Sequence, residues 1–512
     1  MRRGVIATAG LLSVALFSAW GQDYALGTNK VAVLTLNDVT ERALRSNRQL
    51  QIERVNPEIA RLTLQASRGI YDPIFTSLAQ TESTSDTGGF DPANFSNDAV
   101  FEAESEVMTG GLIGYLPTGL TYTLGGNYAH SEGTRNFLNF DSYRAGASIT
   151  AQQPLLRDFW IDQPRWTIQV NKRNLKISEL GVQFVAMSII SLTQQGYYDL
   201  AFAWDNHRIY RELLETRSEF LKGIRRQIEL GMVTALEEKL AQSQEATVQT
   251  DLVAARNAIG LASNNLRNLI GTEGSQWTQE TLAPADLLLA VPQTIDRQAS
   301  WSTGLRRRPD LLQLAMNLEN ADLTVRYRKN QLFPLLNVIG SYGLKGSDAL
   351  QAFPPDKPKA DFSLAWRQIE SQSAPNSVIG LLFSMPLTRT TERANYKMSK
   401  ELRKQAELLL RQKEELILRE ISDAADVAQF SFERFEAARN AAQFADQALE
   451  AEGQKLRGGT GSIFLVLQAQ SGKASAKVSE LTARRDYNKA LAALYFAEGT
   501  LLERCGVKLE FK

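Results

Sequence analysis

The sequence predicts a mainly α-helical protein with a β-strand portion of the membrane-barrel kind, built around duplicated long coiled-coil helical hairpins. The first observation is a proline-free helical run from Arg165 to Leu269 that is broken once, at Gly231. A comparable run extends from about Arg393 to Leu502 and is broken near Gly459. The third observation is the alternating, strand-like segment that precedes each run. These features indicate a tandem duplication rather than several ordinary domains.

Composition excludes several functional classes. The 512 residues include 57 Lys plus Arg and 57 Asp plus Glu, so there is no basic excess typical of a nucleic-acid binder. Cys505 is the single cysteine of the chain, and His130 and His207 are its two histidines. This composition rules out a disulfide within one chain and a Cys/His metal site. We therefore expect no metal, no cofactor and no partner chosen by net charge.

The N-terminus is typical of a secretory signal peptide. Arg2 and Arg3 precede an apolar run that ends at Trp20, and small residues stand before Gln22. We assign residues 1–21 to a signal peptide, with a membrane anchor as the alternative. Elsewhere we find no uninterrupted apolar run long enough to cross a membrane, so a mature chain that enters one must do so through strands.

The first repeat is assigned to residues 22–272 and opens with helices. A short helix is expected from Thr35, and a second from Asn56, with Pro57 in its first turn, to Arg68, where Gly69 and Pro73 follow.

Residues 74–152 lose the helical period and are assigned to barrel strands. Residues 121–130 and 143–152 alternate apolar or aromatic with small polar side chains, which fits a membrane-barrel strand and a soluble sandwich strand equally well. Residues 116–119 are expected to form a turn, and residues 86–98 a loop.

The first long hairpin is assigned to about residues 165–271. Its ascending helix keeps apolar pairs at seven-residue spacing, although Gly196 and Arg217 interrupt the seam. A helix from Arg165 to Leu230 would be on the order of 100 Å long, which is more than a globular domain needs.

The second half repeats the first after a linker or belt at 273–303. We assign the second repeat to residues 304–503, with strands at about 335–385 and a hairpin at about 393–502, followed by a C-terminal tail at 504–512. Within it, strands are expected at 335–342 and 378–385, with a variable loop at 343–376. Asn47 precedes Pro73 by 26 positions, as Arg308 precedes Pro334, and the two hairpin breaks align at a constant offset of 228.

No catalytic constellation is visible, so we expect the protein not to be an enzyme. The two histidines stand apart from any serine or cysteine arrangement. Glu237 and Glu238 lie within two turns of the first break, where they are either ordinary surface charge or, if several chains close a ring there, acids that line the mouth of a tube.

Taken together, these segments resemble the TolC family of bacterial outer-membrane efflux proteins over nearly the whole mature chain. The resemblance depends on the order of the segments, on the sequence Arg306-Arg307-Arg308-Pro309-Asp310, and on the strand ends Pro154-Leu155 and Pro386-Leu387.

The resemblance implies a homotrimer whose chains share one outer-membrane β-barrel, continuous with a periplasmic α-barrel tunnel. It implies a passive exit duct of a tripartite efflux or type I secretion system, in contact with outer-membrane lipid, a periplasmic adaptor and, through that adaptor, an inner-membrane pump. The hairpin tips would dock the adaptor. The matching positions are Gly231, Met232, Val233, Thr234, Gly459, Thr460, Gly461 and Ser462.

Two departures from the family pattern stand out. Aspartates that narrow the tunnel mouth in the family are replaced by Leu465 and Gln468. We therefore hypothesise a mainly apolar periplasmic gate through Leu465, with Glu237 and Glu238 as the remaining candidate acids. The first half also has four expected strands where the family has two, so the extra hairpin near 104–131 either widens the barrel or stands outside the membrane.

Two other readings share these features in part. A periplasmic coiled-coil adaptor would have a signal peptide and long hairpins, and a secreted helical scaffold would lack a pore. The transported substrate is not indicated by the sequence.

Overall fold

The structure is a computed structural model that describes residues 30–86, 90–91, 96–97, 101–135, 138–272 and 280–507. These residues fall into two compact units. One comprises the chain up to Asn56, Ser178–Gln313 and the chain from Leu410; the other comprises Pro57–Ile177 and Leu314–Leu409. The expected signal peptide and the last residues of the expected tail lie outside the described residues.

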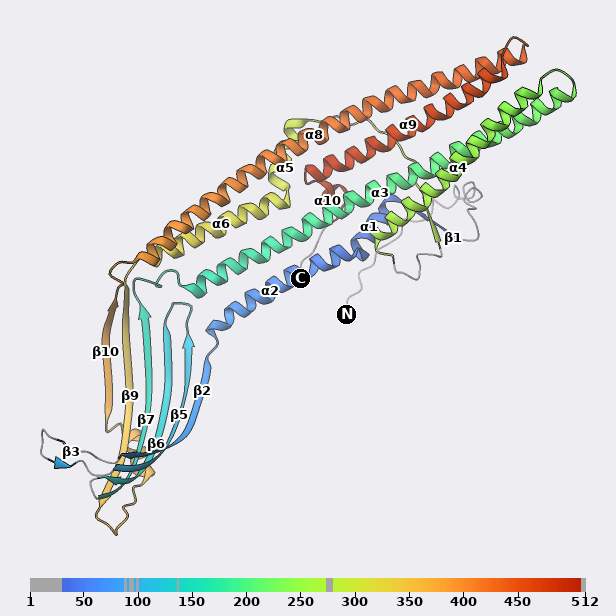
Figure 1. Cartoon of the computed structure of the whole chain (residues 1–512). Helices are drawn as coiled ribbons and strands as arrows, with labels where there is room; N and C mark the ends of the chain where they lie inside the picture. The colour runs from blue at the N-terminus through green and yellow to red at the C-terminus, as the bar shows by residue number, and fades with distance from the viewer. Residues whose placement is uncertain are drawn as a thin grey trace, which may run out of the picture. The chain divides into compact units, whose positions relative to one another are not determined.

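The second unit contains one six-stranded sheet (Figure 1). Its strands are β2 (Ile74–Asp86), β5 (Phe101–Tyr115), β6 (Thr121–Arg135), β7 (Leu138–Pro154), β9 (Leu335–Ala352) and β10 (Pro375–Ser384). Their order is β10-β9-β7-β6-β5-β2, and every neighbouring pair is antiparallel. The expected loop at 86–98 carries the short strands β3 (Phe90–Asp91) and β4 (Ser96–Asn97). The extra hairpin of the first half, β5 and β6, is therefore part of the main sheet.

The sheet has one apolar and one polar face, as the alternation of residues 121–130 and 143–152 predicted. Leu112, Leu124, Ile149 and Tyr342 pair in one row across β5, β6, β7 and β9. One residue further along, on the opposite face, the row carries Thr123, Thr150 and Ser341 on β6, β7 and β9, whereas β5 has the apolar Ile113 in this row. Side chains of successive strand residues point to opposite faces, so this register separates the two chemistries.

Strand β9 and the loop after it differ from the expectation. The strand continues to Ala352 instead of ending at Tyr342, because β7 pairs with it from Asn337 to Ala352. β10 begins at Pro375 rather than Val378. The expected variable loop contains a helix, α7 (Phe362–Glu370), whose N-cap Asp361 accepts a hydrogen bond from Ser363 N.

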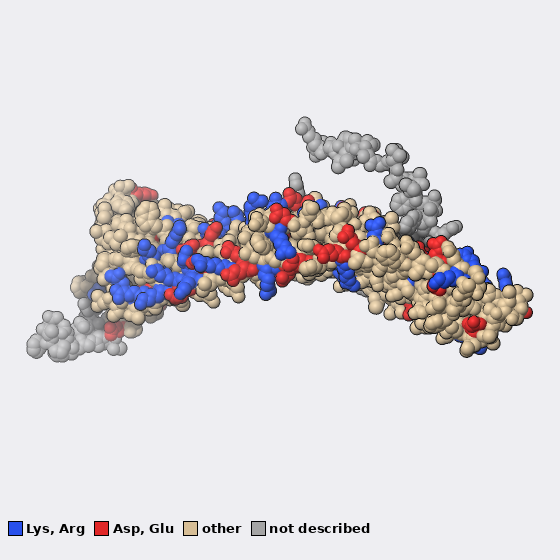
Figure 2. Space-filling model, turned by 90° about the horizontal axis from the view of Figure 1, so that it is seen from above, with Lys and Arg blue, Asp and Glu red and all other residues tan. Residues whose placement is uncertain are grey.

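The predicted long hairpins are present. The first consists of α3 (Gln163–Glu229) and α4 (Ala235–Ile270), and the second of α8 (Thr390–Arg457) and α9 (Ile463–Ala497), which α10 (Leu501–Arg504) follows. α3 and α8 contribute residues to both units. On the face shown in Figure 2, basic and acidic side chains are interleaved along the helices. At Gly196, a Cβ atom would lie 3.2 Å from Leu269 Cδ1, so glycine in the seam permits the close approach of α4.

α3 bears on the expectation that no segment after the N-terminus is apolar and long enough to cross a membrane. Among the described helices, it is long and apolar enough to cross a membrane by length and composition. However, Val182, Ile189 and Leu200 are fully buried in the largest hydrophobic cluster of the first unit. These residues place one side of α3 in the core of the unit.

The internal repeat is visible in matching helix pairs. α1 (Leu36–Ser46) is joined to α2 (Arg48–Arg68) through Asn47, and α5 (Arg297–Arg307) to α6 (Pro309–Asn330) through Arg308. Asn47 Oδ1 accepts a hydrogen bond from Leu50 N at 3.1 Å, so α2 is capped there and not at Asn56. The expected start of α2 was therefore wrong, and Pro57 lies inside the helix.

The segment between the repeats is held against other elements of the first unit. β8 (Glu280–Pro284) pairs in parallel with β1 (Lys30–Leu34), a pairing that the sequence did not indicate. Tyr487 of α9 donates a hydrogen bond to Val291 O at 2.7 Å. α5 begins at Arg297, within the range expected to be linker.

Candidate functional site at the helix tips

Both hairpin tips end their first helix with the same backbone geometry. Gly231 and Gly459 have φ values of +71° and +77°, a conformation that favours glycine. In the first tip, Met232 N donates to Gln227 O and Gly231 N to Ile228 O; in the second, Thr460 N donates to Lys455 O and Gly459 N to Leu456 O. These are Schellman motifs, which satisfy the last carbonyls of a helix.

The two tips differ at the start of the second helix. In the first, Thr234 caps α4, and Glu237 Oε2 accepts from Thr234 N at 2.9 Å and from Thr234 Oγ1 at 3.1 Å. Ser462 caps α9 at the equivalent position, and Leu465 stands where the first tip has Glu237. The second tip therefore has an apolar side chain where the first has a capping acid.

Both candidate acids of the first tip take part in local contacts. Glu237 completes the capping box of α4. Glu238 Oε1 accepts from Arg225 Nε of α3 at 3.0 Å and from Gln242 Nε2 at 2.9 Å. A carboxylate already paired with an arginine offers less charge to a passing cation, so Glu238 is a weaker gate candidate than its position suggested.

Both tips carry exposed apolar side chains. On the first tip, Leu230, Met232 and Leu236 are 74%, 73% and 78% exposed. On the second, Phe464 and Leu465 are exposed, and Gln468 lies exposed one turn further along α9. Leu236 and Phe464 were missed from the sequence, although they correspond at the same offset of 228 that relates the two turns.

The remaining turn residues support the tip from within. Val233 packs against a small hydrophobic core made of residues from α3, α4 and α9, among them Leu221 and Ile463. Gly461 N donates to Lys455 O at 3.0 Å, and a Cβ at Gly461 would lie 2.5 Å from Leu456 N. Glycine is therefore required there by a close backbone approach.

Behind this core, a buried arginine joins the two hairpins. The side chain of Arg217 is 3% exposed and belongs to α3. Its Nη1 donates to Gln244 O at 2.7 Å and to Gln244 Oε1 at 2.9 Å, both on α4. Its Nη2 donates to Leu467 O at 3.3 Å and to Ser471 Oγ, both on α9. Burial lowers the pKa of Arg217, and Asp251 only partly opposes this effect.

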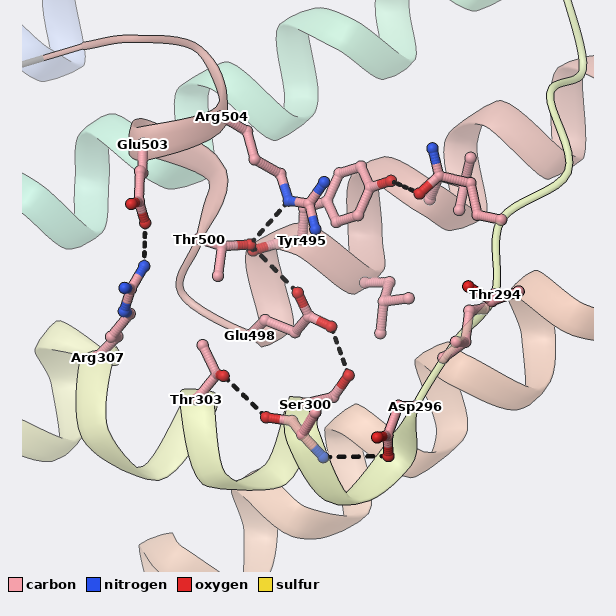
Figure 3. Close-up of a pocket in the computed structure, with 15 residues that line it drawn as sticks. Thr294, Asp296, Ser300, Thr303, Arg307, Tyr495, Glu498, Thr500, Glu503 and Arg504 are labelled. Atoms are coloured by element: carbon pink, nitrogen blue, oxygen red, sulfur yellow. Dashed lines mark hydrogen bonds and ion pairs between the residues drawn. The ribbon is translucent and has the colours of Figure 1, made fainter.

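A pocket of about 480 Å³ lies elsewhere in the first unit, between α5 and the α9–α10 junction (Figure 3). Buried Glu498 accepts from Ser300 Oγ at 2.6 Å and from Thr500 Oγ1 at 3.2 Å. Arg504 lies 3.8 Å from the ring centroid of Tyr495. These contacts tie α5 to the end of the second hairpin.

Both histidines lie against aromatic side chains. His130 Nε2 lies 2.8 Å from Asp141 Oδ1, and its ring stacks on Tyr143. His207 lies beside Trp204, and burial lowers the pKa of His207. Among the residues that the structure describes, no group of His, Cys, Asp and Glu could hold a metal ion.

Comparison with known proteins places the chain among outer-membrane proteins. The family described as outer membrane efflux protein matches residues 118–272 and 302–500. Outer membrane protein TolC of Escherichia coli (strain K12) is 23% identical over 332 residues, or 61% of each chain. Probable outer membrane lipoprotein SilC of Salmonella typhimurium is 19% identical over 186 residues, or 36% of this chain and 39% of that protein. The chain thus matches less than two thirds of the length of these relatives.

Solved structures with the same fold cover more of the chain. The outer-membrane channel OprN has a TM-score of 0.64 and 19% identity, over 91% of this chain and 90% of that one. The CmeC outer membrane channel of Campylobacter jejuni has a TM-score of 0.62 and 16% identity, over 91% and 85%.

Proposed function

Because the chain belongs to the outer membrane efflux protein family and is a protein of the outer membrane with a periplasmic helical part, we propose that it is the exit duct of a tripartite export system. Substrates would pass through it from an inner-membrane pump and a periplasmic adaptor to the cell exterior. The chain itself supplies no energy, and we propose a passive, gated role rather than catalysis.

The observation that carries this proposal is the pair of sheet edges. Within the described residues, β2 pairs only with β5 and β10 only with β9. Since six strands alternate in direction, β2 and β10 run antiparallel to each other, so β10 of one copy can pair with β2 of the next. A sheet cannot remain open in a bilayer, where every backbone group must be satisfied. Copies of the chain arranged in a ring resolve both edges.

A ring of three copies gives three times six, or 18, strands. The family resemblance implies four strands per chain and therefore 12 in a trimer. Barrel diameter grows roughly linearly with strand number, so the lumen is about 1.5 times as wide as the resemblance implies. In this assembly β5 and β6 widen the barrel, and the periplasmic tips of the helical hairpins form the narrowest point of the duct.

The tips are the proposed docking and gating end. The exposed apolar side chains of Leu230, Met232 and Leu236 would pack against the periplasmic adaptor around the turns at Gly231 and Gly459. Leu465, with its neighbour Phe464, would close the mouth by apolar contact between copies. Opening would require the two hairpins of each chain to separate near Arg217.

Cross-linking tests the assembly. We would place a cysteine at Ser77 of β2 and single cysteines along β10, in a Cys505→Ser background, and oxidise whole outer membranes. Covalent trimers should form at alternate β10 positions, because successive residues face opposite sides. A cysteine at Thr123 of the inner strand β6 serves as the matched control and should give no link between chains. Recovery of the chain as a soluble periplasmic monomer would instead favour an adaptor or a secreted scaffold.

Charge substitutions test the gate. If closure is apolar, Glu237→Gln and Glu238→Gln should leave the cation selectivity of single channels unchanged, whereas Leu465→Ala should raise the open probability. A loss of cation selectivity in the glutamine variants would show that these acids line the gate.

A further inference from the structure

The helix α7, which interrupts the connection from β9 to β10, lies on the apolar face of the sheet. The ring of Phe362 packs edge-on against Tyr128 and Tyr143, at centroid distances of 5.2 and 6.1 Å. Both tyrosines belong to the face that carries Leu124 and Ile149. At Gly346 on the same face, a Cβ atom would lie 1.8 Å from Ala365 O, so the backbone of α7 rests directly on β9.

α7 is fastened at both ends by hydrogen bonds to the sheet. Gln368 accepts from Ser347 N at 3.1 Å and donates to Ser347 O at 2.9 Å, beyond the point where β10 begins. At the other end, Asp361 N donates to Asp348 Oδ2 at 2.7 Å, and Ala360 N to Asp141 Oδ2 at 2.8 Å. The helix is therefore a fixed part of the sheet surface.

Its position coincides with a chemical boundary on that face. Along β9, from Leu336 to Gly346, the apolar-face positions carry no charge, and the next such position is Asp348. Ten residues of strand rise about 33 Å, or roughly 25 Å along the normal of a tilted barrel, which is the height of the apolar band of an outer-membrane barrel. The row that ends at Asp348 also contains Glu106, His130 and Tyr143. α7 thus lies at the edge of the apolar band that is farther from Leu336.

The exposed side chains of α7 suit that level. Phe362, Leu364 and Trp366 are 37%, 41% and 46% exposed, although they are large and apolar. Trp366 Nε1 donates to Glu370 Oε1 at 2.8 Å, so its polar edge is satisfied beside a charged residue. Aromatic side chains with one apolar and one polar side concentrate at membrane–water interfaces, as do amphipathic helices.

From these contacts we infer that α7 is an interfacial helix, which inserts Phe362 and Trp366 among the lipids at the outer boundary of the bilayer and sets the height of the barrel there. The occupant of its exposed side is lipid, because that side continues the lipid-facing surface of the sheet. This inference rests on the proposed function for the placement of the sheet in the membrane.

Spin labels on the full-length protein in proteoliposomes test the inference. Each variant has one cysteine in a Cys505→Ser background, and accessibility is measured to oxygen, which partitions into lipid, and to a water-soluble nickel complex. We expect the label at Trp366→Cys to have a several-fold higher ratio of oxygen to nickel accessibility than the label at Arg367→Cys, its neighbour on the polar side of α7. Leu364→Cys provides a second exposed apolar position on the same helix.

Two further positions separate this inference from the proposed function. Ile149→Cys, in the middle of the apolar face, should be lipid-exposed, and Asn127→Cys, on the polar face, should be open to nickel. If Ile149 were not lipid-exposed, the proposed placement of the sheet would fail. If Ile149 behaved as expected but Trp366 were as open to nickel as Arg367, or shielded from both reagents, lipid would not be the occupant of α7 and the inference would be overturned.

Discussion

Replacing Arg217 by methionine should uncouple the two hairpins of a chain near the tip. Methionine keeps much of the side-chain volume but removes all four hydrogen bonds of the guanidinium group. Two of these bonds, to Leu467 O and Ser471 Oγ, reach the second hairpin. A hydrogen bond to a charged group contributes about 1.5–3 kcal/mol, so the contact between hairpins would weaken by about 3–6 kcal/mol per chain.

The free energy of unfolding of the first hairpin should change less than the free energy of contact between the two hairpins. Arg217 is buried without a carboxylate in contact, and removing a buried ion from that position recovers several kcal/mol of desolvation free energy. That gain offsets the lost bonds to Gln244 within the hairpin. The effect should therefore be seen in gating rather than in the unfolding temperature.

Single-channel recording in planar bilayers is the assay. Since about 1.4 kcal/mol is tenfold in an equilibrium constant, a shift of 3–6 kcal/mol predicts an open-to-closed ratio raised by about two to four orders of magnitude. Arg208→Met is the matched control, because Arg208 forms its ion pairs with Asp205 and Glu212 inside α3. Wild-type currents from Arg217→Met, with the trimer intact, would refute the idea that opening separates the hairpins at this level.

Three more outcomes are expected. Leu465→Asp should place an acid from each copy at the mouth and shift the reversal potential in a salt gradient toward the cation value; an unchanged potential would show that residue 465 does not line the pathway. Burial alone would raise the pKa of Asp310, but hydrogen bonds from Arg308 and Lys413 hold that pKa below its ordinary value of 3.8, so the stability it contributes is present above about pH 4 and lost as pH falls through the lowered pKa. Thermal unfolding at pH 7 and pH 3 should therefore differ less for Asp310→Asn than for the wild type, and an equal difference would contradict this role. Deleting residues 101–135 leaves β2 and β7 antiparallel, so the barrel should close at about two thirds of its diameter in electron micrographs, unless the hairpin is not part of the ring.

The features that the sequence predicted well have strong local causes. A helix cannot pass Gly231 or Gly459 in a left-handed conformation, so both tips were visible as breaks in otherwise regular periodicity. The spacing that matched Asn47 with Arg308 was confirmed, since both residues link two consecutive helices. Alternation on residues 121–130 and 143–152 placed two of the six strands for a similar reason.

The features that were missed depend on distant partners. The part of β9 after Tyr342 has the composition of a polar loop, and only its pairing with β7 makes it a strand. β1 and β8 are five-residue strands whose parallel pairing joins segments 250 positions apart. Arg217 was visible only as a flaw in the α3 seam, because its acceptors lie on α4 and α9.

The tip acids show the limit of reasoning from position. Glu237 and Glu238 were candidates because they stand near the first turn. The side-chain contacts that engage them, with Thr234 and Arg225, depend on the geometry of the turn and on the opposite helix. Their roles in gating stay a prediction.

The two open edges of the sheet also constrain how the protein is made. β2 and β10 are 13 and 10 residues long, β10 has no charged side chain, and β2 has none before Glu82. Such edges are prone to pair with any other strand, and soluble proteins usually protect them with charge or bulges. A newly exported chain therefore carries an aggregation hazard at both ends of its sheet until other copies arrive. In the proposed assembly, barrel closure would be the last, concentration-dependent step of biogenesis, and the chain would have to be kept from premature pairing on its way across the periplasm.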